Sequence, residues 1–103
     1  MIFAERVYSL LKKVPKGRVT TYKALGDALG TRAYRAVGQA LRHNPYAPSV
    51  PCHRVVSSNG SIGGFNGKTS GKDIARKKKM LEDEGILFNG NMVRDFYSVK
   101  FVF

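Results

Sequence analysis

Three prolines spaced three residues apart constrain this chain more than any other feature. Pro45, Pro48 and Pro51 stand directly before Cys52. Proline has no amide hydrogen and disfavours helical backbone at the residue before it, so no α-helix can cross this segment. We therefore predict a stiff, extended segment that leads to Cys52 and then enters a short buried strand at residues 55–56.

Cys52 is the only cysteine in the chain, and His53 and Arg54 follow it directly. A lone cysteine can be simply a small buried hydrophobic residue. Neighbouring cations, however, favour the reactive thiolate. One cysteine excludes an internal disulfide and is typical of a reducing compartment. His43 and His53 are too few further ligands for a zinc site, so we expect no metal.

The charge balance is strongly basic, with 18 Lys and Arg against 7 Asp and Glu, a net charge of +11. Such a domain favours a polyanionic partner, with nucleic acid first. The alternative is a lysine-rich surface that serves only solubility. The length of 103 residues indicates one domain, residues 1–103. The start of the chain lacks the pattern of a secretory leader, and no stretch reaches membrane-spanning length, so we expect an intracellular, soluble protein.

Residues 18–43 have the pattern of a helix-turn-helix. Thr21 is a good N-cap for a helix that ends at Gly30. Thr31 can cap a second helix over residues 32–43. Two short helices joined by a turn that contains glycine are the outline of this motif.

The second of these predicted helices has two distinct faces. Small apolar residues form the stripe expected to be buried: Ala33, Ala36, Val37, Ala40 and Leu41. The opposite side carries Arg32, Arg35, Gln39 and Arg42. A helix that packs closely on the body and turns cations outward suits contact with nucleic acid. The alternative is an ordinary solvated basic face.

The remaining elements are predicted from periodicity and turn residues. A tight hairpin is expected at Asn59-Gly60, and the Gly-rich loop that follows lets backbone approach a ligand closely. The other predictions are a helix over 2–13, a helix over 70–84 with Ile74 and Leu81 on its apolar side, a turn at 89–90 and a strand over 98–103.

Glu84 stands where the negative end of a helix dipole disfavours an acid. Lysines four residues earlier can pair with Glu82 and Asp83, but Glu84 has Met80 at that spacing. We predict that Glu84 has a partner elsewhere in the fold, the alternative being a frayed acidic helix end.

A thiol, a base and an acid that orients the base make a nucleophilic site. Cys52, a histidine and Glu84 supply these residue types. His53 is the nearest base, but neighbouring side chains on a strand point to opposite faces. A Cys–His link therefore requires a bridging water or an irregular backbone.

The segment Pro51-Cys52-His53-Arg54-Val55-Val56 follows Arg42-His43-Asn44-Pro45 and precedes the loop from Gly63 to Gly67. Together these stretches closely resemble the active-site region of the O6-alkylguanine-DNA alkyltransferases, also called methylated-DNA–protein-cysteine methyltransferases. The resemblance runs from about Val7 to Gly85. It implies an α+β fold, with a winged-helix-like helix-turn-helix and short strands around the cysteine.

The resemblance also implies a function. Members of this family flip O6-alkylguanine out of duplex DNA and transfer the alkyl group irreversibly to a cysteine, so each molecule acts once. No cofactor takes part. The expected partner is double-stranded DNA that contains O6-alkylguanine, and the expected state is a monomer in the cytoplasm, associated with the nucleoid in a prokaryote.

By matching positions, the resemblance assigns four residues to the chemistry. Cys52 is the alkyl acceptor, and His53 is the general base acting through a water. Glu84 orients His53, and Asn44 is a hinge that supports the site.

Other matched residues handle the DNA and the base. Tyr22 rotates the 3′ phosphate, and Arg35 fills the gap in the stack left by the flipped base. The backbones of Cys52 and Val55, with Asn66, recognise guanine. Phe65 walls the pocket where the family often has tyrosine. The basic face adds Arg32, Gln39 and Arg42 as DNA contacts.

Family members commonly carry an N-terminal domain that this chain does not show. Three other functions compete with alkyl transfer. Alkyltransferase-like proteins bind alkylguanine without transfer, but they replace the cysteine. A helix-turn-helix regulator leaves the Pro-Cys-His-Arg motif unexplained. A cysteine hydrolase would share the Cys–His–acid chemistry, but nothing indicates an oxyanion hole.

Overall fold

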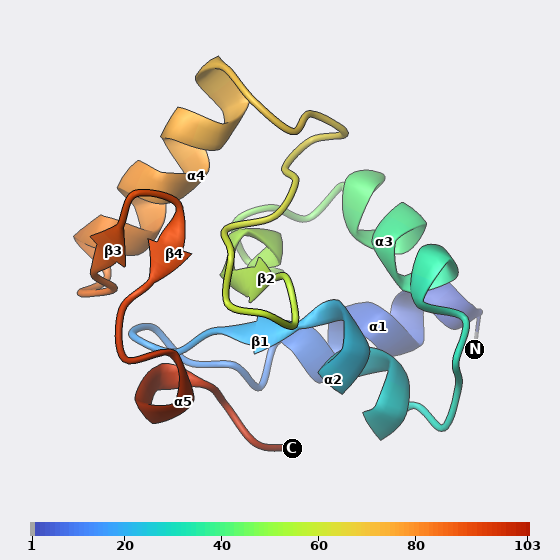
Figure 1. Ribbon diagram of the computed structural model, residues 1–103. Coiled ribbons are helices and arrows are strands. Elements are labelled where there is room, and N and C mark those ends of the chain that lie inside the picture. The colour runs from blue at the N-terminus through green and yellow to red at the C-terminus, as the bar shows by residue number, and fades with distance from the viewer. Residues whose placement is uncertain (1) are drawn as a thin grey trace.

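Short helices and two-residue strands alternate along residues 2–103, the part of the chain that the computed structural model describes (Figure 1). In chain order they are α1 (Phe3–Leu11), β1 (Thr20–Thr21), α2 (Tyr22–Ala28), α3 (Tyr34–Arg42), the 3-10 helix η1 (Cys52–Arg54), β2 (Val55–Val56), α4 (Lys72–Asp83), β3 (Phe88–Asn89), β4 (Met92–Val93) and α5 (Phe96–Val99). The predicted α+β class is confirmed. None of the described helices is long and apolar enough to cross a membrane.

The predicted helix at the N-terminus is confirmed as α1, somewhat shorter than residues 2–13. Its buried residues are Val7, Tyr8 and Leu11. The Tyr8 hydroxyl donates a 2.7 Å hydrogen bond to the Ala40 carbonyl of α3. This bond satisfies a polar group in the core and ties α1 to α3.

The first helix of the predicted helix-turn-helix begins as expected. The Thr21 hydroxyl accepts a 2.9 Å hydrogen bond from the Ala24 amide, and α2 ends just before Gly30. Thr21 also belongs to β1, so one residue ends a strand and caps the next helix. This arrangement sets the direction in which Tyr22 leaves the sheet.

The second helix begins two residues later than predicted. The Thr31 hydroxyl accepts from the Ala33 amide, 3.0 Å away, so it closes a turn before the helix and does not cap it. The N-cap is Ala33. The shift has a packing reason, because the Tyr34 ring lies directly over Gly26: a Cβ at Gly26 would come within 2.6 Å of it. Glycine therefore permits the close contact between α2 and α3.

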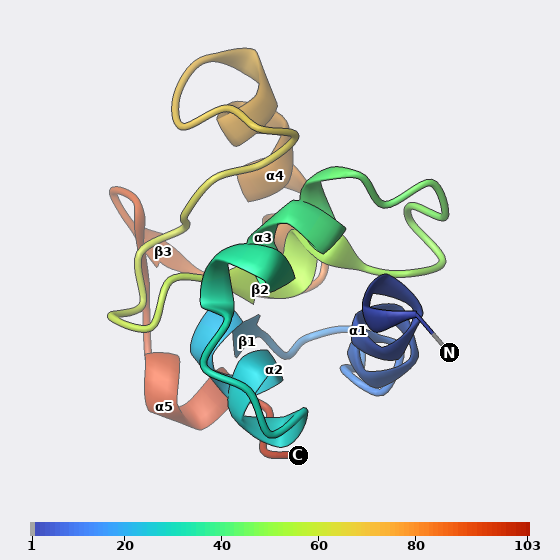
Figure 2. The same ribbon diagram turned by 90° about the vertical axis from the view of Figure 1, so that its right-hand side faces the viewer.

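The two faces of α3 follow the prediction in part. Val37, Ala40 and Leu41 are buried, and the predicted basic side is exposed along its length. Ala33 and Ala36, however, are exposed, so the predicted apolar stripe was too wide. Ala33 precedes the helix, and the three buried residues already fill the contact that α3 makes with α1 and α2 (Figure 2).

The prediction of an extended segment before Cys52 is wrong. Residues 45–49 form turns, the Ala47–Pro48 peptide is cis, and Cys52 begins the 3-10 helix η1. The Val50 amide donates to the Tyr46 carbonyl at 3.0 Å, and the Arg54 amide donates to the Pro51 carbonyl at 2.9 Å. Prolines exclude an α-helix here, but they are compatible with tight turns.

The buried strand predicted after the cysteine is confirmed as β2, and it pairs in parallel with β1. Because β2 takes this partner, the hairpin predicted at Asn59-Gly60 does not form. Only its turn is present, with a 2.9 Å bond from the Ser57 amide to the Ser61 carbonyl.

The C-terminal part agrees with the prediction at α4 and at the turn between β3 and β4. Ile74 and Leu81 of α4 are buried as expected, and so is Lys77. The strand predicted over 98–103 is wrong, because its first residues belong to α5 and only Lys100 forms a bridge, to Val19. A second core cluster lies beside the one that α1, α2 and α3 share, and it draws residues from β2, α4, β4 and α5 together with Val19, which directly precedes β1.

Candidate active site

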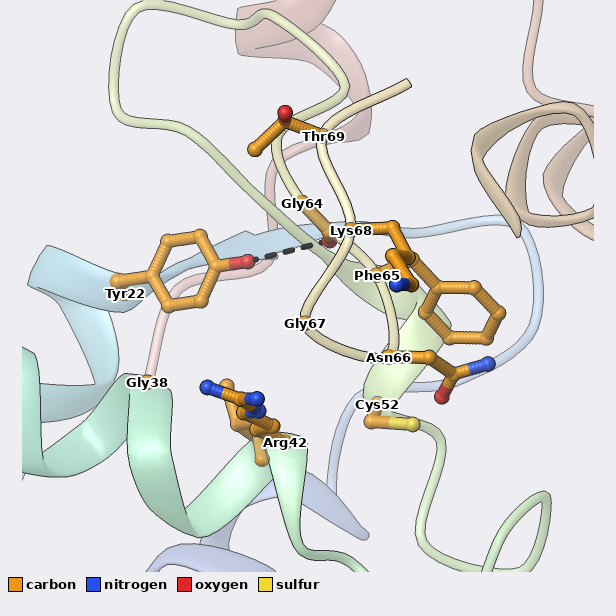
Figure 3. Close-up of a pocket in the computed structure, with 11 residues that line it drawn as sticks. Tyr22, Gly38, Arg42, Cys52, Gly64, Phe65, Asn66, Gly67, Lys68 and Thr69 are labelled. Carbon is orange, nitrogen blue, oxygen red and sulfur yellow. Dashed lines mark hydrogen bonds between the residues drawn. The ribbon is translucent and has the colours of Figure 1, made fainter. Parts of the chain in front are cut away.

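Cys52 lines a cavity of about 290 Å³ that is open to solvent. Four parts of the chain form its walls: Tyr22 of α2, one side of α3, η1 and the Gly-rich loop. Figure 3 shows the loop on one side of the cavity and Tyr22 and Arg42 on the other. The lining consists of Tyr22, Gly38, Leu41, Arg42, Cys52, Gly64, Phe65, Asn66, Gly67, Lys68 and Thr69.

The tip of the Gly-rich loop is tightly folded. Phe65 and Lys68 exchange two backbone hydrogen bonds, each 2.9 Å long. Gly67 between them has a φ of +75°, and a Cβ there would come within 2.7 Å of Arg42 Nε. Glycine is therefore required both by the backbone conformation and by the Arg42 side chain that lies against the loop.

The base of the same loop is bound by one buried cation. Lys77 of α4 has 0% of its surface exposed, and its ammonium donates to the carbonyls of Val55, Ile62 and Gly64. The bonds to Val55 and Gly64 are 2.7 and 2.9 Å long. Tyr22 approaches the Gly64 carbonyl from the cavity, with its hydroxyl 3.5 Å away. Lys77 thus joins α4, the start of β2 and the cavity wall.

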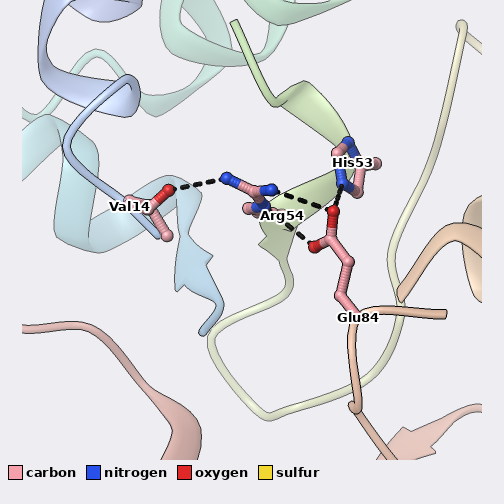
Figure 4. Close-up of polar contacts among 4 residues, drawn as sticks. All are labelled: Val14, His53, Arg54 and Glu84. Carbon is pink, nitrogen blue, oxygen red and sulfur yellow. Dashed lines mark hydrogen bonds and ion pairs between the residues drawn. The ribbon is translucent and has the colours of Figure 1, made fainter. Parts of the chain in front are cut away.

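On the other side of Cys52, a carboxylate lies between two side chains of η1. Arg54 donates two hydrogen bonds to Glu84, from Nε to Oε1 and from Nη2 to Oε2, both 2.9 Å long (Figure 4). His53 Nε2 lies 2.9 Å from Glu84 Oε2. Arg54 Nη1 also donates to the Val14 carbonyl at 2.8 Å. The predicted tertiary partner of Glu84 is therefore present, and it is a forked arginine together with a histidine.

These contacts determine the charge states in the cluster. Burial alone would raise the pKa of Glu84, but the hydrogen bonds from Arg54 and His53 outweigh it, and the pKa lies below its usual value. Burial lowers the pKa of His53, with Glu84 opposing that effect. At neutral pH the pair is thus a carboxylate and a neutral imidazole.

The neutral imidazole has a defined tautomer. A carboxylate only accepts hydrogen bonds, so the proton is on Nε2 of His53 and Nδ1 is free to accept one. No hydrogen bond joins Cys52 to His53 directly within residues 2–103. The water predicted between them stays a prediction.

Burial also acts on the two other titratable groups near the cavity. It lowers the pKa of Lys77 to about 7, although the charge of Cys52 works in the opposite direction. Burial raises the pKa of Tyr22, so its hydroxyl keeps its proton at neutral pH and can donate.

The structure brings most of the predicted site residues together. Tyr22, Arg42, Cys52, Phe65 and Asn66 all line the cavity. Of the predicted DNA contacts outside the cavity, Arg35 and Gln39 are exposed on α3, and Arg32 is exposed just before this helix.

Two of the predicted site residues, Val55 and Asn44, make hydrogen bonds within the protein that involve backbone groups. Val55 is buried, and its carbonyl is already bound by Lys77. Asn44 binds both ends of the turn before Cys52: its side chain donates to the Val50 carbonyl and accepts from the Tyr46 amide, both at 2.9 Å.

Two residues of the site were not predicted. Arg54 was noted as a neighbour of Cys52 but not as the partner of Glu84. Lys77 was not singled out, although it stands between Ile74 and Leu81 at the spacing of the buried face. A lysine on the apolar side of a helix was the signal that could have identified it.

The chain matches the family model described as "6-O-methylguanine DNA methyltransferase, DNA binding domain" over residues 2–86. A methylated-DNA–protein-cysteine methyltransferase of Metallosphaera sedula is 46% identical over 85 residues, which are 82% of this chain and 50% of the relative. The chain thus spans about half the length of the curated relatives it matches.

Solved structures agree with this match. Mycobacterium tuberculosis OGT in complex with DNA is 40% identical, with a TM-score of 0.72, over 82% of this chain and 50% of that one. Atl1 of S. pombe, in complex with damaged DNA containing O6-carboxymethylguanine, is 30% identical with a TM-score of 0.74. That likeness covers 96% of this chain and 94% of Atl1.

Proposed function

Because this chain belongs to the 6-O-methylguanine DNA methyltransferase family, we propose that it repairs DNA by moving the O6-alkyl group of a guanine onto Cys52. The observation that carries the proposal is the position of Cys52. It lines an open cavity and directly precedes a buried histidine whose Nε2 is bound to a paired carboxylate.

The proposed chemistry is one displacement. His53 Nδ1 takes the thiol proton of Cys52 through a water, and the sulfur attacks the alkyl carbon. The bond between that carbon and O6 breaks, and its electron pair passes to the guanine ring, which takes up the proton at N1. Glu84 keeps His53 oriented and stabilises the imidazolium that forms. The thioether is not hydrolysed, so each molecule reacts once.

The basic face of α3 supports a role in DNA binding. Arg35 and Gln39 are exposed there, Arg32 is exposed just before the helix, and Arg42 extends the same face into the cavity. We assign to Arg35 the place vacated by the flipped base and to Tyr22 the contact with the neighbouring phosphate. Extruding a base costs a few kcal/mol, and a planar guanidinium recovers part of the lost stacking.

The cavity walls support recognition of the extruded guanine. Asn66 and Cys52 line the cavity and offer polar groups, and Phe65 offers a ring for stacking. The backbone of Val55 is bound within the protein, its amide to the Cys52 carbonyl and its carbonyl to Lys77, so contact with guanine would require a rearrangement there. Asn44 supports this surface from behind, because it holds the turn that leads into η1.

A direct test is the intact mass of the protein after incubation with DNA that contains O6-methylguanine. Transfer adds one methyl group to the wild type and none to Cys52→Ser. The Ser variant should still bind the lesion. An unchanged wild-type mass at full lesion binding would contradict the proposal.

A second candidate function is lesion recognition without transfer. The likeness to Atl1, a protein solved in complex with damaged DNA, supports recognition of a lesion. The presence of Cys52 in the cavity favours transfer. The same mass measurement separates the two functions.

A further inference from the structure

Two cations line the cavity beside Cys52 without a partner. They are Arg42 and Lys68, and no Asp or Glu is among the lining residues. Neither side chain makes a hydrogen bond or an ion pair with another described residue. The cavity therefore offers two charged donors that the fold itself does not use.

The nearest acids do not offset this charge. Both oxygens of Glu84 are bound by Arg54. Asp73 accepts a 3.2 Å hydrogen bond from Asn66 and lies 3.7 Å from Arg76. With the acids engaged, the potential in the cavity favours a negatively charged group.

Arg42 belongs to the cavity as well as to the DNA-facing side of α3. Its Nε lies so near Gly67 that even a methyl group at that residue would collide with it. Lys68 belongs to the opposite wall, the Gly-rich loop, where its backbone exchanges two hydrogen bonds with that of Phe65. A ligand group placed between α3 and the loop, next to Cys52, would have one cation on each side (Figure 3).

We propose that this cavity prefers O6-alkyl groups that carry a carboxylate, such as carboxymethyl, with Arg42 and Lys68 as the residues that bind the carboxylate. The inference rests on the proposed function and names a substrate class for it. That Atl1, a protein of this fold, was solved with DNA containing O6-carboxymethylguanine is consistent with an anionic adduct reaching such a cavity.

The proposed reaction is balanced without an oxidant or reductant. The sulfur of Cys52 bonds to the methylene carbon of the adduct, and the bond from that carbon to O6 breaks. The products are S-carboxymethylcysteine and guanine, with the thiol proton on guanine N1. The carboxylate is unchanged, and the two cations offset its repulsion of the approaching thiolate.

The test compares duplexes that carry O6-carboxymethyl-, O6-carbamoylmethyl- or O6-methylguanine. The first two adducts have nearly the same shape and differ in charge. Single-turnover transfer rates give the ratio of carboxymethyl to carbamoylmethyl transfer. We expect this ratio to fall about tenfold in Arg42→Gln/Lys68→Gln, which is the effect of losing one charge-assisted hydrogen bond. Taking the ratio removes the difference in intrinsic reactivity between the two adducts.

The matched control is Arg32→Gln/Lys72→Gln, which removes the same charge from exposed residues outside the cavity. Weaker DNA binding in this variant should slow all three adducts together and leave the ratio unchanged. An unchanged ratio in the cavity variant, or an equal fall in the control, would overturn the inference and assign both cations to DNA phosphates.

Failure of the proposed function has a different signature. In that case the wild type transfers no group from any of the three duplexes. The same ratio is then measured from dissociation constants, and its response to Arg42→Gln/Lys68→Gln still supports or overturns the preference for a carboxylate.

Discussion

Two charged clusters flank Cys52, and they are built in opposite ways. In the first, the carboxylate of Glu84 meets the opposite charge of Arg54 and the ring of His53. In the second, the ammonium of Lys77 meets only backbone carbonyls, and no carboxylate pairs with it among residues 2–103. One cluster joins side chains to each other, and the other joins a side chain to the backbone.

The difference indicates what each cluster does. Arg54 offsets the cost of burying Glu84, and the pair then holds one nitrogen of His53 in a set protonation state. Lys77 has no opposite charge to offset its burial, so its pKa falls to about 7, and its hydrogen bonds hold the loop to β2. The first cluster controls a proton, whereas the second controls the shape of the cavity wall.

Replacement of Lys77 should have the largest effect. Lys77→Met keeps the length of the side chain but leaves the buried carbonyls of Val55 and Ile62, and the partly buried carbonyl of Gly64, without the lysine donor. Each unsatisfied group costs about 1–3 kcal/mol, so we expect the free energy of unfolding to fall by about 3 kcal/mol or more. Urea unfolding measures this change, and cleavage of the Gly-rich loop by a protease should become faster.

The control for that variant is Lys79→Met on the same helix. Lys79 is exposed and pairs only with Asp83, 2.6 Å away. Loss of such an exposed pair changes stability little, because water screens the two charges. Equal losses in the two variants would show that Lys77 has no special role in the loop.

Replacement of Glu84 should cost less stability but act on the chemistry. Glu84→Gln keeps one acceptor and removes the charge, and we expect a loss of about 1.5–3 kcal/mol. Alkyl transfer should slow at least tenfold, because His53 loses the group that orients it. The affinity of this variant for undamaged DNA should stay near that of the wild type. A transfer rate equal to that of the wild type would show that Glu84 has no role in the chemistry.

The contributions of the two clusters to stability should change with pH at opposite ends of the pH range. The pKa of Lys77 is lowered from 10.5 to about 7, so above pH 7 the unfolded chain binds the proton that the native protein has released. Stability from this residue is therefore lowest below pH 7 and rises with pH up to about 10.5. Between pH 7 and 9, the difference in unfolding free energy between wild type and Lys77→Met should grow by about 2 kcal/mol.

The contribution of Glu84 also rises with pH, but it does so in the acid range. Its pKa is lowered below 4.5, so its contribution is present above that pH and is lost as the pH falls through the lower native value. The difference between wild type and Glu84→Gln should persist at neutral pH and disappear only in acid. If the difference in stability already begins to shrink near pH 7 as the pH falls, the titrating group is His53 and not Glu84.

The smallest expected effect comes from Phe65, on the loop that Lys77 holds. Its ring lies 5.7 Å from the Arg76 guanidinium and lines the cavity without a polar group. Phe65→Tyr adds a hydroxyl that can donate to the O6 of guanine, and we expect transfer to speed up by a few fold. The control is Phe88→Tyr, outside the cavity, which should leave the transfer rate unchanged. A slower Phe65→Tyr variant would mean that the hydroxyl displaces the ring from its place on the loop.

Local chemistry explains which parts of the fold could be predicted. The cap at Thr21, the end of α2 before Gly30 and the basic face of α3 all depend on residues within a few positions of each other. The need of Glu84 for a partner was also local, because its conflict with the helix dipole can be seen in the sequence. The site residues around Cys52 came from a resemblance to a family rather than from spacing.

What the sequence by itself determined is therefore the helices α1 to α4, the reactive motif and the sign of the surface charge. Tertiary structure alone decided that β1 lies beside β2, that Arg54 is the partner of Glu84 and that Lys77 is buried beneath the loop. Each of these contacts joins segments at least 13 residues apart. Its stability depends on how the two segments pack, and no pattern within either segment specifies that packing.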